Sequence, residues 1–271
     1  MRKTKQTGQL LRSQQGTQGW FVRVGLALGC LILVVAGVGL RAQNAKAMGE
    51  TSKFQWARLV FKQSTNTRPT SIRRLLWLTT KRTSLQPELK VKGIKVSNPK
   101  LFQYPLVIIS GETSFPAWPK EDIRRMRSYL SAGGTLFIDM TGGEANGPFD
   151  KSVRRLAKRL FPQSPLQKLP RKHTLYRSFY LIQRFGGRRL LNPYIEGVTR
   201  DDRTPIIYSM NDHSGAWERD SFGHWVYPVV PGGENQREHA LRFGINLIMY
   251  ALCVNYKQDG VHIPFIMRRR Q

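Results

Sequence analysis

Four polar side chains have the types needed for acid–base chemistry and could meet at one edge of a predicted sheet. They are Asp139, His173, Asp212 and His213. Carboxylates and imidazoles within hydrogen-bond reach of each other can transfer protons or hold a divalent metal ion. One candidate function is therefore a hydrolase that uses Asp139, His173 and Asp212, with or without a metal ion.

Each of these side chains also has an ordinary structural role open to it. Asp139 could cap loop N–H groups at a strand end, His173 could satisfy backbone groups in a loop, and Asp212 could form an Asx turn. The sequence contains no H-E-x-x-H or C-x-x-C spacing. The main prediction therefore includes no confident catalytic residue, no metal site and no cofactor.

Candidate ligand-binding residues share a place at or near the ends of predicted strands. Gly142 and Gly143 could offer backbone N–H groups to a phosphate or carboxylate, or form an ordinary flexible loop. Arg203 could pair with Asp139 or with an aspartate beside it, at position 201 or 202. Ser110 lacks the G-x-S-x-G context of a serine hydrolase. The full set is Ser110, Gly111, Glu112, Thr141, Gly142, Gly143 and Arg203.

A strand–helix–strand stretch at residues 101–139 must position most of these side chains. Leu106–Ile109 is a short apolar run, which is typical of a parallel strand buried on both faces. Pro119 favours the start of a helix, and Gly133 favours its end. Thr135–Ile138 predicts the second strand. Such a right-handed crossover gathers ligands beyond the carboxyl ends of its strands.

The remaining pattern predicts an α/β fold, a three-layer sandwich around a mostly parallel sheet. We expect the folded domain to cover residues 54–256. Asp150 is expected to cap one helix, and Asn235 with Glu238 forms a capping box for another. Expected strands lie at 54–61, 91–96, 194–195 and 205–209, and expected helices at 70–80, 151–161 and 235–254.

The charge of the chain is strongly positive, with 44 Lys and Arg against 17 Asp and Glu and a net charge of +27. Residues 151–189 contain twelve Lys or Arg and no acidic residue. This composition favours an anionic partner such as phospholipid headgroups or acidic glycans, although a merely solvated basic surface is equally open. A nucleic-acid partner is disfavoured, because no interleaved aromatic platform is evident.

An apolar segment precedes the domain. Residues 1–19 are polar and basic, and we expect them to be disordered. Residues 20–47 contain 17 consecutive uncharged residues, Val24–Leu40, which predict either a signal peptide cleaved after Ala45-Lys46-Ala47 or a single transmembrane anchor. Either outcome predicts export, with the domain in the periplasm or anchored to the inner membrane outside the cytoplasm. Residues 257–271 form a basic C-terminal tail.

Several motifs in fixed order resemble those of a bacterial family called the domain-of-unknown-function 4159 family. They include F-x-W-A-R-L, Y-P-L-V-I-I-S-G, Y-L-x-x-G-G-T-L-F-I-D and I-I-Y-S-x-N-D, and the resemblance covers about Phe54–Tyr256. The resemblance implies a flavodoxin-type fold similar to class I glutamine amidotransferases, export or membrane anchoring, and no agreed activity. In working amidotransferases a cysteine follows the strand that here ends at Asp139, but this chain has Met140 and Thr141 there. Glutamine hydrolysis is therefore not expected.

These observations lead to one main functional prediction. The chain is expected to be a non-catalytic binding or scaffolding domain of the bacterial cell envelope that recognises an anionic ligand or a protein partner. If its leader is not cleaved, the N-terminal hydrophobic helix attaches it to the membrane. The envelope hydrolase described above is the alternative.

Overall fold

The computed structural model describes residues 53–62 and 66–268. The predicted N-terminal segments, 1–19 and 20–47, lie outside the described residues. Among the residues that are described, no helix is both long enough and apolar enough to cross a membrane. The folded unit begins at Phe54.

Seven strands form one mixed sheet in the order β2-β1-β3-β4-β7-β6-β5. The strands are β1 (Trp56–Leu59), β2 (Lys92–Ile94), β3 (Leu106–Gly111), β4 (Thr135–Met140), β5 (Gln167–Lys168), β6 (Glu196–Arg200) and β7 (Arg203–Ser209). The helices are α2 (Ser71–Arg82), α3 (Lys120–Ser131), α4 (Pro148–Leu160), α5 (His213–Trp217) and α6 (Gly233–Arg268), with short 3₁₀ turns η1 (Pro99–Gln103) and η2 (Thr174–Arg177).

The centre of the sheet is parallel, which confirms the predicted α/β class. β2, β1, β3, β4 and β7 pair in parallel, whereas β6 and β5 pair in antiparallel fashion. The register places Ser110 of β3 opposite Asp139 of β4, and Asp139 opposite Ser209 of β7. Three polar side chains therefore stand in one row across the carboxyl ends of neighbouring strands.

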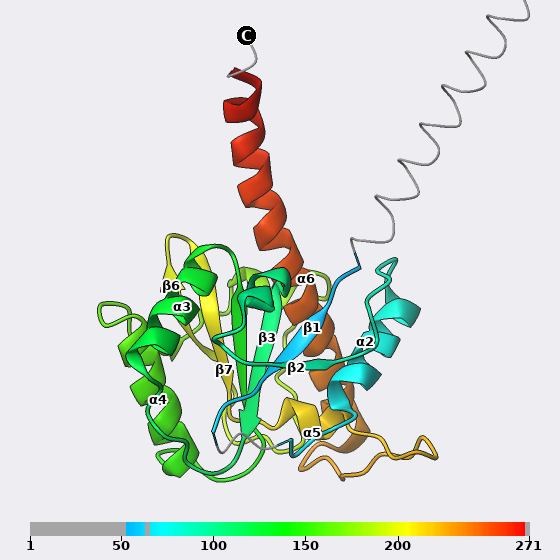
Figure 1. Cartoon of the computed structure of the whole chain (residues 1–271). Helices are drawn as coiled ribbons and strands as arrows, with labels where there is room; N and C mark the ends of the chain where they lie inside the picture. Colours follow the sequence, from blue (N-terminus) through cyan, green and yellow to red (C-terminus); the bar gives the residue numbers. More distant parts are fainter. Residues whose placement is uncertain (1–52, 63–65, 269–271) are drawn as a thin grey trace, which may run out of the picture. The chain divides into compact units, whose positions relative to one another are not determined.

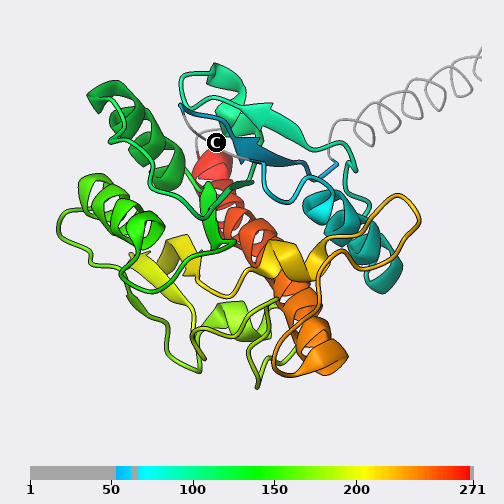
Figure 2. The ribbon, with the colours of Figure 1, turned by 90° about the horizontal axis from the view of Figure 1, so that it is seen from below.

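Helices cover both faces of the sheet (Figures 1 and 2). On one face, α3 and α4 pack against the alternate residues Val107, Ile109, Leu136 and Ile138. On the other face, α2, α5 and α6 pack against Leu106, Ile108 and Phe137. Because successive side chains of a strand point to opposite faces, one apolar strand supplies both cores.

Both edges of the sheet end in very short strands. β2 has three residues and β5 has two. β6 joins β7 with a register irregularity between Val198 and Arg200. These features leave little continuous backbone exposed at either edge.

Several boundaries differ from those the sequence predicted. Asp150 lies in the first turn of α4 rather than at its N-cap, which is Gly147, because Pro148 already begins the helix. α6 begins at Gly233, so its predicted capping box lies inside the helix. α6 also continues to Arg268, into the predicted tail, although its glycine at 260 and proline at 264 disfavour helix. The strand expected at 194–195 lies at β6 instead.

Candidate functional site

Asp139 is the next-to-last residue of β4 and is fully buried. Its Oδ1 accepts a hydrogen bond from the backbone N–H of His213 at 3.0 Å, and its Oδ2 accepts one from Ser214 at 2.7 Å. Both N–H groups belong to the first turn of α5, whose N–H groups have no partner within the helix. Asp139 therefore holds α5 to the sheet, which is the structural role open to it in the sequence.

Asp212 is the N-cap residue of α5 and adopts a left-handed backbone conformation with φ of 50°. Its side chain accepts a hydrogen bond from Gly215 N–H at 2.8 Å. Two arginines complete its environment: Arg68 Nη2 lies 2.8 Å from Oδ2, and Arg188 Nε donates to the same oxygen. Asp212 is thus a buried carboxylate shared between one helix terminus and two guanidinium groups.

Arg68 links three segments at this edge of the sheet. Besides Asp212, its guanidinium donates to the Thr141 carbonyl at 3.0 Å and to the Tyr227 hydroxyl at 3.1 Å, and it lies 4.2 Å from the centre of the Tyr227 ring. Arg188 also donates to the Thr141 carbonyl, at 3.4 Å. Sequence reasoning missed both arginines, since Arg68 lies 144 residues from Asp212 and no local motif marks the pair.

Burial changes the proton affinity of two groups at this site. Burial, and then the nearby charge of Asp212, raise the pKa of Asp139 to about 7, against the opposing effect of its N–H donors. Burial lowers the pKa of His213 to about 3, so its imidazole is neutral at physiological pH. The site therefore contains no cationic histidine that could act as a general acid.

The His213 ring lies in an aromatic environment rather than in a hydrogen-bond network. It stacks on Phe243 with ring centres 4.2 Å apart and on Trp217 at 5.9 Å. Within the described chain, neither ring nitrogen has a hydrogen-bond partner, and the hydroxyls of Ser110 and Ser214 are also buried without one. A ring placed in this way is not oriented for proton transfer to Asp139.

His173 does not join this group, which corrects the expectation that it would. Its Nε2 lies 2.8 Å from the hydroxyl of Thr204, and its Nδ1 accepts the N–H of Leu175 at 3.1 Å. Thr204 is near the start of β7, five positions before Ser209, or about 16 Å away at ~3.3 Å per residue. His173 therefore lies near the amino ends of the parallel strands, whereas Asp139 lies near their carboxyl ends, because the partner of His173, Thr204, is near the start of β7 and Asp139 pairs with Ser209 at the end of β7.

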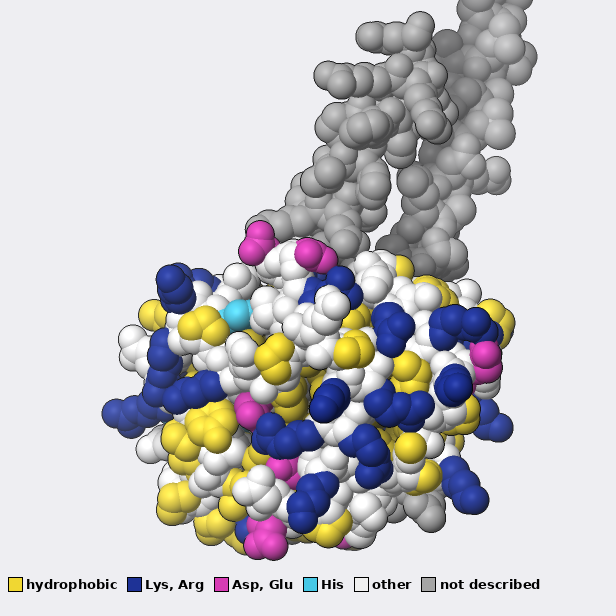
Figure 3. Space-filling view, turned by 90° about the vertical axis from the view of Figure 1, so that its left-hand side faces the viewer, with side chains coloured by type: hydrophobic (Ala, Val, Ile, Leu, Met, Phe, Trp, Pro, Cys, Tyr) yellow, Lys and Arg dark blue, Asp and Glu magenta, His cyan; other side chains and the backbone are white. Residues whose placement is uncertain are grey.

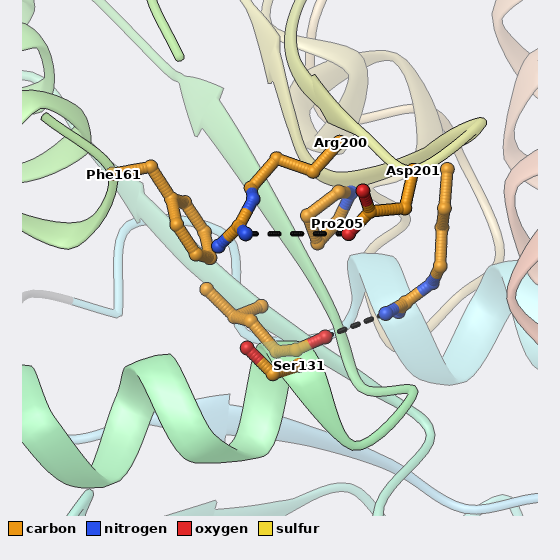
Figure 4. A pocket seen from close by; sticks show the side chains of 7 residues that line it. Ser131, Phe161, Arg200, Asp201 and Pro205 are labelled. Atoms are coloured by element: carbon orange, nitrogen blue, oxygen red, sulfur yellow. Dashed lines mark hydrogen bonds and ion pairs between the residues drawn. The ribbon is translucent and has the colours of Figure 1, made fainter. Parts of the chain in front are cut away.

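Arg203 also lies at the amino ends of the parallel strands, so it does not pair with Asp139 near their carboxyl ends. It begins β7 and donates to the carbonyl of Leu130 at 2.5 Å and to those of Gly133 and Gly134, at the end of α3. A cavity of about 230 Å³ lies beside it, and Figure 4 shows Arg200 between Phe161 and Asp201 there. Arg203 therefore has a structural role, because it donates to backbone carbonyl groups. From the sequence alone, an arginine with this role looks the same as an arginine that binds a ligand.

The predicted ligand-binding loops do meet, but their geometry opposes an anion at the glycines. A Cβ atom placed on Gly142 would lie 2.4 Å from Oε2 of Glu112, so the carboxylate of Glu112 covers Gly142. Gly143 has a φ of 83°, a backbone conformation that glycine adopts without the steric cost of a Cβ atom. A Cβ atom on Gly111 would lie 2.8 Å from the ring of Phe149. An incoming anion at Gly142 would therefore meet a negative group first.

A model of the family described as "Domain of unknown function (DUF4159)" matches residues 55–252. The chain belongs to the DUF4159 family. No curated protein matches it. The solved structures that match include one titled "mmIFT52 N-terminal domain", at 11% sequence identity and a TM-score of 0.34, over 58% of this chain and 86% of that one. A likeness at this TM-score supports no conclusion about the fold or the function of the DUF4159 domain.

The donor set of the DUF4159 domain also bears on metal binding. Throughout residues 53–62 and 66–268, no group of three or more His, Cys, Asp or Glu side chains could hold a metal ion. Cys253 lies in α6 and is exposed, whereas β4 ends at Met140 and is followed by Thr141, so no cysteine stands there. The site thus offers two engaged carboxylates and a neutral imidazole, an arrangement suited to holding α5, Arg68 and the strand ends together.

Proposed function

We propose that the DUF4159 domain is a non-catalytic binding module of the cell envelope that recognises an anionic partner. Its amidotransferase-like fold lacks the nucleophilic cysteine, and its partner is an anionic ligand or an envelope protein with an acidic surface. The apolar segment at residues 20–47 supports export, with the domain in the periplasm or anchored to the inner membrane.

The carboxylates at the carboxyl ends of the strands are poorly suited to catalysis. Asp139 uses both oxygens to accept N–H groups of α5, and Asp212 accepts from Arg68, Arg188 and the N–H of Gly215. A carboxylate with these partners is poorly placed to take a proton from a substrate. The geometry of this edge therefore favours a structural centre over an active site.

The observation that carries the proposal is the basic face formed by α3 and α4. These two helices contain nine Lys or Arg and three Asp or Glu, and Figure 3 shows many cationic and few anionic side chains on this face. Arg124 pairs with Glu121, and Arg154 pairs with two carboxylates. Four exposed cations have no carboxylate partner among the described residues: Lys120, Arg125, Lys151 and Lys158.

Other arginines of this face keep their charge while they stabilise the fold. Arg127 donates to the carbonyls of Arg159 and Leu160, and Arg155 donates to the carbonyl of Phe115 at 2.5 Å. A carbonyl partner fixes a guanidinium in place but does not neutralise it. The α3–α4 basic face is therefore a positioned set of positive charges, which favours an anionic partner over a merely solvated surface.

A binding experiment on the full chain tests this proposal. We expect the chain to bind vesicles that contain phosphatidylglycerol, or a polyglutamate peptide, and to release them as salt rises. Changing the four exposed cations to glutamine should weaken vesicle binding on the order of 1,000-fold, because each cation near an anionic surface contributes about 1 kcal/mol. Co-sedimentation or light scattering at two salt concentrations measures this.

The matched control removes four exposed lysines elsewhere: Lys90, Lys92, Lys100 and Lys172. Equal loss of binding in both quadruple variants would mean that only the net charge matters, and it would contradict a dedicated face. Binding of neither anionic probe would also overturn the proposal. Hydrolysis of an ester, amide or phosphoester library that disappears in Asp139→Asn would overturn the non-catalytic part.

A further inference from the structure

A groove of about 530 Å³ lies between α2 and the loop after α5, on the face of the sheet opposite the α3–α4 basic face. Both views of the ribbon place this loop beside α2 (Figures 1 and 2). The groove is lined by three arginines and two aromatic side chains: Arg73, Arg74, Arg219, Trp77 and Phe222. Its volume is in the range of pockets that hold small molecules, about 300–1,000 Å³.

The arginines of the groove have no carboxylate partner among the residues that the structure describes. Burial, and then the nearby charge of Arg219, lower the pKa of Arg74 from its ordinary value. Asp220 also lines the groove, but its Oδ1 accepts N–H groups of its own loop, from Phe222 at 2.9 Å and His224 at 2.8 Å. Like charges are thus held close together, and an anion placed between them would relieve their repulsion.

Glu218 does not supply that negative charge within the groove. Its side chain is buried outside the lining, and its Oε1 accepts the backbone N–H of Thr70 at 3.0 Å. Burial raises the pKa of Glu218, which disfavours the negatively charged form of its carboxyl group. Among the residues that line the groove, three arginines stand against one carboxylate, that of Asp220, so an excess of positive charge remains open to a ligand.

The aromatic side chains define the second part of the groove. Phe222, at the tip of the loop, has 85% of its surface exposed, and Trp77 on α2 has 38% exposed. The guanidinium of Arg74 lies 4.0 Å from the centre of the Trp77 ring, and that of Arg219 lies 3.7 Å from the Trp225 ring. These contacts hold the cations in place, while Phe222 presents an apolar ring to water that a planar ligand could cover.

We propose that this groove binds a small planar aromatic anion. Its carboxylate or phosphate group lies between the guanidinium groups of Arg73, Arg74 and Arg219, whose flat forks match such oxygens. Its ring packs between Phe222 and Trp77. This site is separate from the α3–α4 basic face and does not depend on the function proposed for that face.

Isothermal titration of the full chain with defined probes tests the inference. The probes are 2-naphthoate, its neutral analogue 2-naphthamide, and adenosine 5′-monophosphate, so that carboxylate and phosphate anions are compared separately. We expect at least one anion to bind and the neutral analogue to bind about tenfold or more weakly, as expected for loss of a charge-assisted hydrogen bond.

Two variants assign the binding to the groove. Arg74→Gln should weaken the anion about tenfold or more, and Phe222→Ala should weaken it about fivefold or more through loss of ring stacking. Phe222 is too exposed for its removal to unfold the protein, so that variant separates binding from stability. The matched control, Arg125→Gln on α3, should leave probe binding unchanged and should weaken only binding at the α3–α4 basic face.

Three results would overturn the inference. The first is that neither anion binds. The second is that 2-naphthamide binds as tightly as 2-naphthoate, which would show an apolar surface without anion recognition. The third is that Arg74→Gln and Phe222→Ala, each with an unchanged unfolding midpoint, bind the anions as the unchanged chain does.

Discussion

Buried polar groups at the carboxyl edge of the sheet differ in how well their hydrogen-bonding needs are met. Asp139 and Asp212 each have several protein donors, whereas the ring nitrogens of His213 have no partner among the described residues. An unpaired buried polar group costs about 1–3 kcal/mol. Since the ring of His213 packs flat on Phe243, a phenyl ring would keep its contacts without that cost.

We therefore expect His213→Phe to raise the free energy of unfolding by about 1 kcal/mol at pH 7. The advantage of the variant should grow as pH falls from about 6.5 towards 3. In that window unfolded His213 binds a proton, while the folded residue, whose pKa is about 3, does not. The slope should reach about 1.4 kcal/mol per pH unit.

Urea unfolding of both proteins between pH 4 and 8 measures this difference. Asp139 titrates in both chains, so its contribution cancels from the comparison. The backbone N–H of residue 213, which Asp139 accepts, is also unchanged. A difference that stays constant with pH would mean that the imidazole is solvated or paired in the folded state.

The sequence predicted some of these residues correctly and misplaced others. Asp139 and Asp212 could be placed together because each follows a predicted parallel strand, and such strands end at the same edge. His173 and Arg203 were misplaced because no local pattern shows to which edge a loop returns. Arg68 was missed because its carboxylate partner is remote in the sequence.

At the level of secondary-structure elements, the joint between α3 and β7 depends on one side chain. Arg203 donates to three carbonyls at or after the end of α3, at Leu130, Gly133 and Gly134. Carbonyls at a helix C-terminus have no partner within the helix. The arginine thus satisfies a buried turn that neither element satisfies alone.

Replacing this arginine should weaken the joint. We expect Arg203→Met to lower the free energy of unfolding by about 1–3 kcal/mol, as for loss of hydrogen bonds from a charged donor. Amide hydrogen exchange should accelerate in the last turn of α3. The control is Arg200→Met, whose guanidinium lies 5.0 Å from the Phe161 ring and 4.0 Å from Asp201. Equal effects of the two changes would argue against a specific capping role.

The sequence predicted some helices and strands more accurately than others. The β3–α3–β4 unit followed from its apolar runs, its proline and its glycines, and the observed bounds lie close to the expected ones. β5 was not anticipated and β6 was expected too early in the chain, at 194–195, because residues 163–205 mix prolines, glycines and short apolar runs without a period of two. A two-residue strand such as β5 forms because the neighbouring strand β6 offers hydrogen-bond partners, and its own sequence carries no strand pattern.

For the molecule as a whole, the charge is a cost to folding as well as a basis for binding. A chain with a net charge of +27 repels itself most strongly in its compact form. Several cations of α3 and α4 are held by carbonyls rather than by carboxylates, so they do not reduce this repulsion. Dissolved salt should reduce it.

We therefore expect the melting temperature of the full chain to rise with sodium chloride between about 10 and 300 mM, as the Debye length falls below 10 Å. Relief of each 1 kcal/mol corresponds to roughly 2–4 °C for a domain of this size. The glutamine variant of Lys120, Arg125, Lys151 and Lys158 should gain less. A melting temperature that is insensitive to salt, or that falls, would contradict this.

The short strands at the two edges of the sheet limit how this protein can associate with others. A partner that adds its own strand needs a run of free backbone N–H and C=O groups, and β2 and β5 offer three and two residues. Growth of the sheet from chain to chain is disfavoured for the same reason. These edges therefore favour recognition through side chains of the helices and loops, and aggregation by strand addition has little template on which to start.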